Sequence, residues 1–228
     1  MAGILYVVST PIGNLQDISL RAVEILKNVD IIACEDTRKT GLLLQNLKIP
    51  KKLLLSYYEE NEIKKIPQII NELKFGKNVA LVTNAGTPTV SDPGFKLVRE
   101  CISQSIKVIP IPGPSAFLAA LVASGFPTDK FLFLGYLPKK DLKRRKLLEN
   151  FKKISFSCTL ILFESPKRVI KLLKEIELIF GDINLVLARE LTKIFEEFLR
   201  GKPSELIKKL EKNPPKGEIT VLLNIPPS

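Results

Sequence analysis

Short apolar runs alternate with amphipathic segments throughout the first half of the chain. The apolar runs have the composition of buried strands, and the segments between them carry apolar residues at helical spacing. We predict strands over 4–8, 30–34, 53–55, 79–82 and 106–109, a helix that begins after Ser19, and helices over 42–47, 59–73, 94–104 and 114–124. This alternation is typical of a parallel, doubly wound sheet and places the chain in the α/β class.

The second half is separated from the first by Ser124–Lys130, whose Gly and Pro residues mark a turn between a helix and a new strand. Beyond it the pattern predicts strands over 131–134, 158–163, 184–188 and 218–225, and helices within 139–153 and over 169–180 and 204–210. We therefore expect two α/β domains, residues 1–123 and 124–228.

Three loops rich in Gly, Pro and hydroxyl residues each follow an apolar run, at Ser9–Leu15, Leu81–Gly94 and Ile109–Ala116. In a parallel sheet such loops share one edge, where ligands bind. Connecting turns have the same composition, so a purely structural role stays open. The chain has no GxGxxG or GxxxxGK[ST] pattern, which argues against a Rossmann dinucleotide site and a P-loop.

Composition narrows the chemistry. The chain has no histidine, and its three cysteines, Cys34, Cys101 and Cys158, are far apart, so we expect no metal site. A general base must then be a carboxylate, a lysine, a tyrosine or solvent. No apolar stretch reaches the roughly 18 residues of a membrane span, and no signal peptide is apparent, so we expect a cytoplasmic protein without membrane attachment.

Positive charge is concentrated in the second half. Residues 1–120 hold 14 Lys and Arg against 11 Asp and Glu, whereas residues 121–228 hold 21 against 13. The segment Lys139–Lys153 alone has eight basic and two acidic residues. This pattern favours a polyanionic partner, although a lysine-rich surface or a solvated amphipathic helix would give the same composition.

Seven motifs in order resemble one family, the small-subunit rRNA ribose 2′-O-methyltransferases of the tetrapyrrole methylase superfamily. They are YVVSTPIGNLQDIS (6–19), ACEDTRKT (33–40), LVTNAGTPTVSDPG (81–94), IPGPSAFLAALVASG (111–125), FLGYLP (133–138), FESPKR (163–168) and ARELTKIFEE (188–197). The resemblance implies a homodimer that holds S-adenosylmethionine between two α/β domains and modifies a decoding-centre cytidine of 16S rRNA, in the 30S subunit.

The resemblance also assigns the cofactor pocket. It implies that the pocket is lined by Pro11, Gly13, Asn84, Ala85, Gly86, Thr87, Pro88, Ser115 and Ala116, with Phe163 closing it from the second domain. Two positions depart from the family pattern, which usually has aspartate at Asn84 and histidine at Lys167. Asn84 removes a negative charge beside the cofactor but keeps a hydrogen-bond acceptor.

Four residues are candidates for the general base: Glu35, Asp36, Glu190 and Lys193. Glu35 and Asp36 end the second predicted strand, at the edge that carries the three loops. Asp36 or Thr37 is equally suited to cap the next helix, and Arg189, Glu190 and Lys193 are equally suited to a solvated ion-pair network. The sequence leaves this choice open.

Six cations are candidates for phosphate contacts with RNA: Arg38, Lys140, Arg144, Arg145, Lys167 and Arg168. Two other functions stay open at this stage. A methyltransferase that acts on a tetrapyrrole or another small molecule would keep the cofactor but would not need the basic second half. A non-catalytic RNA-binding protein would keep the charge but would not bind the cofactor.

Overall fold

The computed structural model describes residues 2–227 and divides into two compact units, one ending at Ser115 and the other beginning at Ala116. This division falls before the expected boundary at residue 123. The reason is that helix α5 (Ala116–Val122) contacts strands β7 and β10 of the second unit. Each unit has its own sheet and its own apolar core, and both are of the α/β type, as the sequence predicted.

The first unit is a five-stranded parallel sheet with the strand order β3-β2-β4-β1-β5. Its elements in chain order are β1 (Leu5–Val8), the short 3-10 helix η1 (Leu15–Asp17), α1 (Leu20–Asn28), β2 (Ile31–Cys34), α2 (Thr37–Asn46), β3 (Leu53–Ser56), α3 (Glu62–Lys74), β4 (Val79–Val82), α4 (Phe95–Ser103) and β5 (Val108–Ile111).

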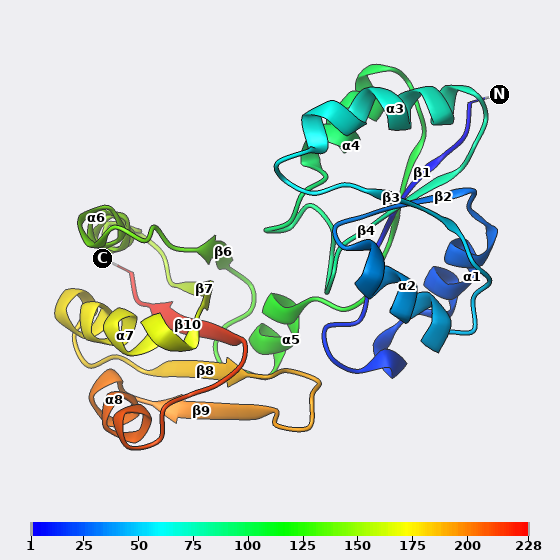
Figure 1. The fold of residues 1–228 in the computed structure, drawn as a ribbon. Helices are drawn as coiled ribbons and strands as arrows, with labels where there is room; N and C mark the ends of the chain where they lie inside the picture. The colour runs from blue at the N-terminus through cyan, green and yellow to red at the C-terminus, as the bar shows by residue number, and fades with distance from the viewer. Residues whose placement is uncertain (1, 228) are drawn as a thin grey trace. The chain divides into compact units, whose positions relative to one another are not determined.

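Helices cover both faces of this sheet, α3 and α4 on one and α1 and α2 on the other (Figure 1). Successive side chains of each strand point to opposite faces of the sheet and pack into the apolar clusters on those two faces. In β2, Ile31 and Ala33 pack with α3 and α4, whereas Ile32 and Cys34 pack with α1 and α2. A strand buried on both faces needs apolar residues at every position, which is why the strands read as continuous apolar runs.

Several elements of the first unit differ from the prediction, among them α2, α3 and β5, whose first residues lie further along or further back in the chain than predicted. Helix α2 begins at Thr37 rather than Leu42, because the Asp36 side chain caps its first turn before the apolar face begins. Strand β5 begins at Val108 rather than Ile106, and Ile106 packs in the core instead. Pro110 is tolerated in β5 because this strand lies at the edge of the sheet.

The second unit has a mixed sheet with the strand order β6-β7-β10-β8-β9, in which β6 pairs parallel with β7 and the other pairs are antiparallel. After α5 its elements are β6 (Phe131–Tyr136), α6 (Asp141–Phe151), β7 (Cys158–Glu164), α7 (Pro166–Phe180), β8 (Leu185–Arg189), β9 (Glu197–Gly201), α8 (Pro203–Lys212) and β10 (Ile219–Ile225). The sequence prediction missed β9, a short edge strand in which only Leu199 is buried and Glu197 and Arg200 interrupt the apolar pattern.

Candidate functional site

The three loops rich in Gly and Pro lie together at the carboxyl edge of the first sheet, since β4, β1 and β5 are neighbours. The first two loops form a bridge, in which the Thr10 amide donates to the Gly86 carbonyl at 2.9 Å and the Gly86 amide donates back at 3.0 Å. The Ser9 hydroxyl donates to Thr87 Oγ1, and Thr87 Oγ1 donates to the Pro114 carbonyl, both at 3.2 Å. The loops therefore hold one another in place.

Gly113 shows how closely the first and third loops approach each other. A Cβ atom at this position would lie 2.9 Å from the Cβ of Ser9, closer than real side-chain contacts allow. Any larger residue would push the third loop away from β1, so the glycine is required by the close approach rather than by its dihedral angles.

A cavity of about 290 Å³ lies between the loop after β1, helix α2 and the loop after β4. Of the expected cofactor residues, it is lined by Pro11, Gly13, Asn84 and Ala85. Its volume is at the lower end of the roughly 300–1,000 Å³ of small-molecule sites. Lys39 of α2 also lines it and supplies a positive charge.

Two buried acceptors near these loops have no hydrogen-bond partner among the described residues, Asn84 Oδ1 and Ser115 Oγ. Buried polar atoms in native proteins are nearly always satisfied, and Asn84 lines the cavity, so its Oδ1 atom is available to a donor group of a ligand. The amino and hydroxyl groups of S-adenosylmethionine are such donors. The residues present therefore fit the expected cofactor.

The other expected cofactor residues have different surroundings. Gly86 and Thr87 join the loops to one another, as described above, and neither lines the cavity. Phe163, in the second unit, packs edge-on against Phe133 with ring centroids 5.0 Å apart. The roles of Pro88, Ala116 and Phe163 toward a cofactor stay predictions.

The two carboxylates that follow β2 have different environments. Asp36 caps α2, where it accepts hydrogen bonds from the amides of Arg38 and Lys39 and from the Arg38 guanidinium. The hydrogen bonds from Arg38 are the main cause that lowers the pKa of Asp36 to about 2. A carboxylate this acidic is a poor proton acceptor near neutral pH, so the capping interpretation describes Asp36 best.

Glu35 points toward the neighbouring strand instead. Its Oε2 atom accepts a hydrogen bond from Thr83 Oγ1 at 3.3 Å and a longer one from the Asn84 amide at 3.4 Å. Thr83 and Asn84 both line the cavity, so Glu35 lies directly behind the cavity wall. Among the four candidates for the general base, Glu35 is the one placed at this edge without an ion pair among the described residues.

Asp92 is a carboxylate of the same edge that sequence reasoning missed. Burial is the main cause that raises the pKa of Asp92 to about 6; the charge of Glu35 acts in the same direction and a hydrogen bond from Thr83 acts against it. Asp92 lies in the SDPG turn at the end of the central loop. The available signal was a carboxylate within a predicted ligand loop, but only the backbone amides of that loop were expected to contact a ligand.

Glu190 and Lys193 form a clamp within the second unit. Lys193 pairs with Glu190 at 2.9 Å and with Glu218 at 3.0 Å, and Glu190 accepts the Glu218 amide at 2.9 Å. Gly217 makes room, because a Cβ there would lie 2.2 Å from the Glu190 carboxyl group. The Glu218 amide and Lys193 lower the pKa of Glu190. This is the ion-pair interpretation, and it favours a structural role for both residues.

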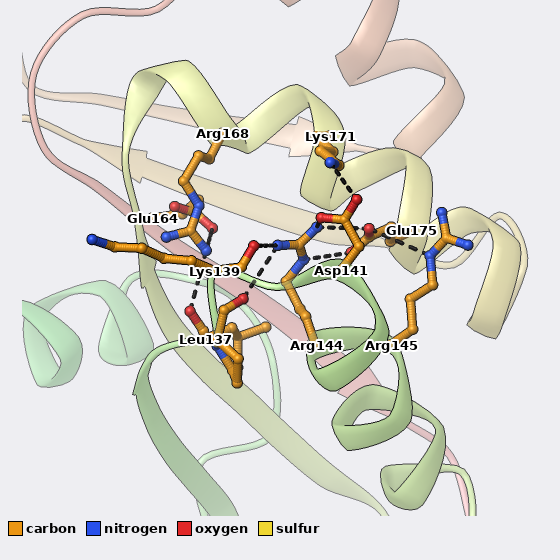
Figure 2. A network of polar contacts seen from close by, with 10 residues as sticks. Leu137, Lys139, Asp141, Arg144, Arg145, Glu164, Arg168, Lys171 and Glu175 are labelled. Atoms are coloured by element: carbon orange, nitrogen blue, oxygen red, sulfur yellow. Dashed lines mark hydrogen bonds and ion pairs between the residues drawn. The ribbon is translucent and has the colours of Figure 1, made fainter.

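The basic segment contains a buried arginine, Arg144, whose polar contacts are drawn in Figure 2. The Arg144 side chain is 3% exposed and donates to both carboxyl oxygens of Glu175, at 2.5 and 2.7 Å. It also donates to Asp141 and to the carbonyls of Pro138 and Lys139. The assignment of Arg144 to RNA contact is therefore wrong, because all of its donors are used inside the protein.

The other expected RNA contacts keep accessible charge to different degrees. Lys140 and Lys167 are exposed, and Arg145 is 45% exposed with one long contact to Glu175. Arg168 is half-buried, where it pairs with Glu164 at 3.2 Å and donates to the Leu137 carbonyl (Figure 2). Arg38, in the first unit, is 90% exposed beside Asp36. Contact between these residues and RNA stays a prediction.

Within residues 2–227, no group of three or more Cys, Asp or Glu side chains is arranged to hold a metal ion. No helix in this part of the chain has the length and apolar character needed to cross a membrane.

Comparison with known proteins places this geometry in a family. The family model of the tetrapyrrole (corrin/porphyrin) methylases matches residues 4–207. A protein of Thermotoga maritima named ribosomal RNA small subunit methyltransferase I is 49% identical over 222 residues, which are 97% of this chain and 98% of that protein. A protein of the same name from a Hydrogenobaculum species is 49% identical over 96% of this chain and 95% of its own length.

Two solved structures share the fold. The cobalamin biosynthetic enzyme cobalt precorrin-4 methyltransferase superposes with a TM-score of 0.68 at 19% identity, covering 96% of this chain and 94% of its own. The uroporphyrin III C-methyltransferase of Thermus thermophilus superposes with a TM-score of 0.65 at 17% identity, covering 96% of this chain and 97% of its own. At these identities the likeness concerns the fold alone.

Proposed function

The chain belongs to the tetrapyrrole methylase family, and we propose that it transfers a methyl group from S-adenosylmethionine to small-subunit ribosomal RNA. The observation that carries this proposal is the identity of 49%, over nearly the full length of both chains, with a relative named for that activity. The basic second half agrees with it, because binding of a polyanion such as RNA requires cations that neutralise its phosphates.

We propose further that the acceptor is the ribose 2′-hydroxyl of a decoding-centre cytidine in 16S rRNA. The seven ordered sequence motifs support this finer assignment, as do the exposed cations Lys140, Arg145 and Lys167, which are available for phosphate contacts. The same motifs support an assembled 30S subunit as the substrate and a homodimer as the active form.

The described residues supply the binding part of this chemistry. When bound, S-adenosylmethionine provides an electrophilic methyl group on a sulfonium. Pro11, Gly13, Asn84 and Ala85 line the cavity that we assign to it, and Asn84 Oδ1 is the acceptor available to its amino or hydroxyl groups. The contacts between the three loops hold these residues in fixed positions, and positioning supplies much of the rate of a group transfer.

The test is methylation of 30S subunits isolated from cells that lack this modification. We expect labelled S-adenosylmethionine and the purified protein to yield 2′-O-methylcytidine in 16S rRNA, detected after digestion to nucleosides. Deproteinised 16S rRNA tests the requirement for an assembled subunit, and a tetrapyrrole acceptor tests the small-molecule alternative. Binding of the cofactor without 2′-O-methylcytidine in either RNA substrate would refute the proposed acceptor.

A further inference from the structure

Five aromatic rings form a row on one face of the sheet of the second unit. Phe117 of α5 stacks on Phe133 of β6 with ring centroids 4.5 Å apart, and its centroid is 6.4 Å from that of Phe131. Phe133 packs edge-on against Phe163 of β7 at 5.0 Å, and the ring of Tyr136 lies 5.7 Å beyond Phe163. The row ends at Tyr136, which is 61% exposed and is the most exposed of the five residues.

A β-bulge places Tyr136 on this face of the sheet. Between two successive pairs of the ladder, β6 advances three residues, from Phe133 to Tyr136, while its partner β7 advances two. Side chains of a strand alternate between the two faces, so without the extra residue Tyr136 would follow Leu134 onto the face that packs in the apolar core. Gly135, within the bulge, has the left-handed φ of 58° that glycine adopts readily. The bulge thus redirects Tyr136 away from the core, as bulges often do beside functional sites.

Three exposed lysines follow the two strands that carry Tyr136 and Phe163. Strands β6 and β7 are parallel, so the segments that follow them leave the sheet at the same edge. Lys139 and Lys140 come after Tyr136, and Lys167 comes after Phe163. None of the three lysines forms an ion pair with another residue of the described range 2–227. Their charges are therefore available to a ligand that binds at this edge.

The acidic side chains of this edge are already paired (Figure 2). Glu164 is buried and pairs at 3.2 Å with Arg168, which also donates to the carbonyl of Leu137, the residue after Tyr136. Asp141 pairs with one cation of α6 at 2.9 Å and with one of α7 at 2.6 Å. The charge left over at the end of the aromatic row is positive and complements a phosphate group.

We propose that Tyr136 stacks on an unpaired nucleobase of the RNA substrate, and that Lys139, Lys140 and Lys167 contact neighbouring phosphates. The inference rests on the proposed function and adds to it a residue that contacts a base. Aromatic rings flanked by cations suit single-stranded nucleic acid, because every base has a π face and the backbone carries the negative charge. S-adenosylmethionine also offers a base, but it has no phosphate and carries a positive sulfonium. The three lysines therefore favour RNA as the occupant.

Tyrosine fluorescence tests the stack directly, because the chain has four tyrosines and no tryptophan. The probe is a short single-stranded oligocytidylate, whose affinity is measured separately by the anisotropy of a dye at its end. Binding of the unlabelled probe should quench the tyrosine emission of the wild-type protein. Tyr136→Phe keeps the ring for stacking, so it should bind within about twofold of wild type but lose this quenching. Quenching of the same size in Tyr136→Phe would overturn the proposal.

Tyr136→Ala removes the ring without removing a charge. Its affinity for the oligocytidylate should fall roughly 5- to 150-fold, the value of one stacked base, while the slope of log affinity against log salt stays the same. Phe156→Ala is the matched control. Phe156 is 47% exposed with Lys130 Nζ 5.6 Å from its ring centroid, but it precedes β7 at the opposite edge of the sheet, so its loss should leave the affinity unchanged. Equal losses for the two variants, or a loss below twofold for Tyr136→Ala, would refute the stack.

Calorimetry with S-adenosylmethionine separates the two sources of a base. Tyr136→Ala should bind the cofactor within about twofold of wild type. A lower affinity for the cofactor with unaltered affinity for the oligocytidylate would assign the ring to the adenine of the cofactor and overturn the proposal.

Binding of the oligocytidylate requires no methyl transfer, so its outcome is independent of the proposed function. If 30S subunits are not methylated but Tyr136 accounts for the quenching and the affinity, the proposed function fails and the stack stands. If subunits are methylated but Tyr136→Ala binds the oligocytidylate as wild type does, the stack is refuted and the proposed function stands.

Discussion

The buried pair of Arg144 and Glu175 should be among the most sensitive points for the stability of the second unit. Both side chains are 3% exposed, so Glu175→Gln leaves a guanidinium charge that water cannot reach. Removing one partner of a buried ion pair typically costs 3–5 kcal/mol. Arg144 keeps Asp141 and two carbonyl acceptors, which places the expected loss near the lower end, at about 3 kcal/mol.

Urea unfolding followed by far-UV circular dichroism measures this loss, with the transitions of the two units fitted separately. Glu211→Gln is the matched control, because Glu211 pairs with Lys174 at 2.8 Å but both side chains are at least half exposed, so its loss should be below about 1 kcal/mol. The double variant Arg144→Met with Glu175→Leu should recover most of the stability, since no buried charge remains. Equal losses for Glu175→Gln and Glu211→Gln would refute the reasoning.

Three further predictions concern the cap, the cavity and the basic surface. The pKa of Asp36 is about 2 in the folded protein and ordinarily about 3.9, so its ionised form stabilises the fold. Asp36→Ala should therefore lower the thermal midpoint above pH 4, and the effect should shrink as the pH falls toward 2. An effect that is the same at every pH would contradict this. Asn84→Ala should weaken S-adenosylmethionine binding about two- to tenfold by calorimetry, the value of one hydrogen bond, and unchanged affinity would show that Oδ1 does not contact the cofactor. Replacing both Lys140 and Arg145 with Gln should reduce the slope of log affinity for rRNA against log salt by roughly 1.4 to 1.8, and an unaltered slope would exclude them from phosphate contact.

The layout of the first unit could be predicted because its strands are buried on both faces. Continuous apolar runs such as Val79–Val82 identify such strands, and the helices between them make the sheet parallel. The second unit was harder to predict. Strand β9 has an apolar run of only two residues, and its pairing with β8, for example Leu187 with Leu199, defines it as a strand.

Some features of the candidate site could likewise be predicted from the sequence, and others could not. The sequence by itself determined which loops meet, because parallel strands place their carboxyl ends at one edge, and it determined that any general base must be something other than histidine. The tertiary structure alone decided the state of each charged group. Asp36 is strongly acidic, Asp92 holds its proton to about pH 6, and Arg144 is buried. The physical reason is that composition and local spacing report a charge, whereas burial and partners distant in sequence, such as Thr83 beside Glu35, determine its pKa and its accessibility.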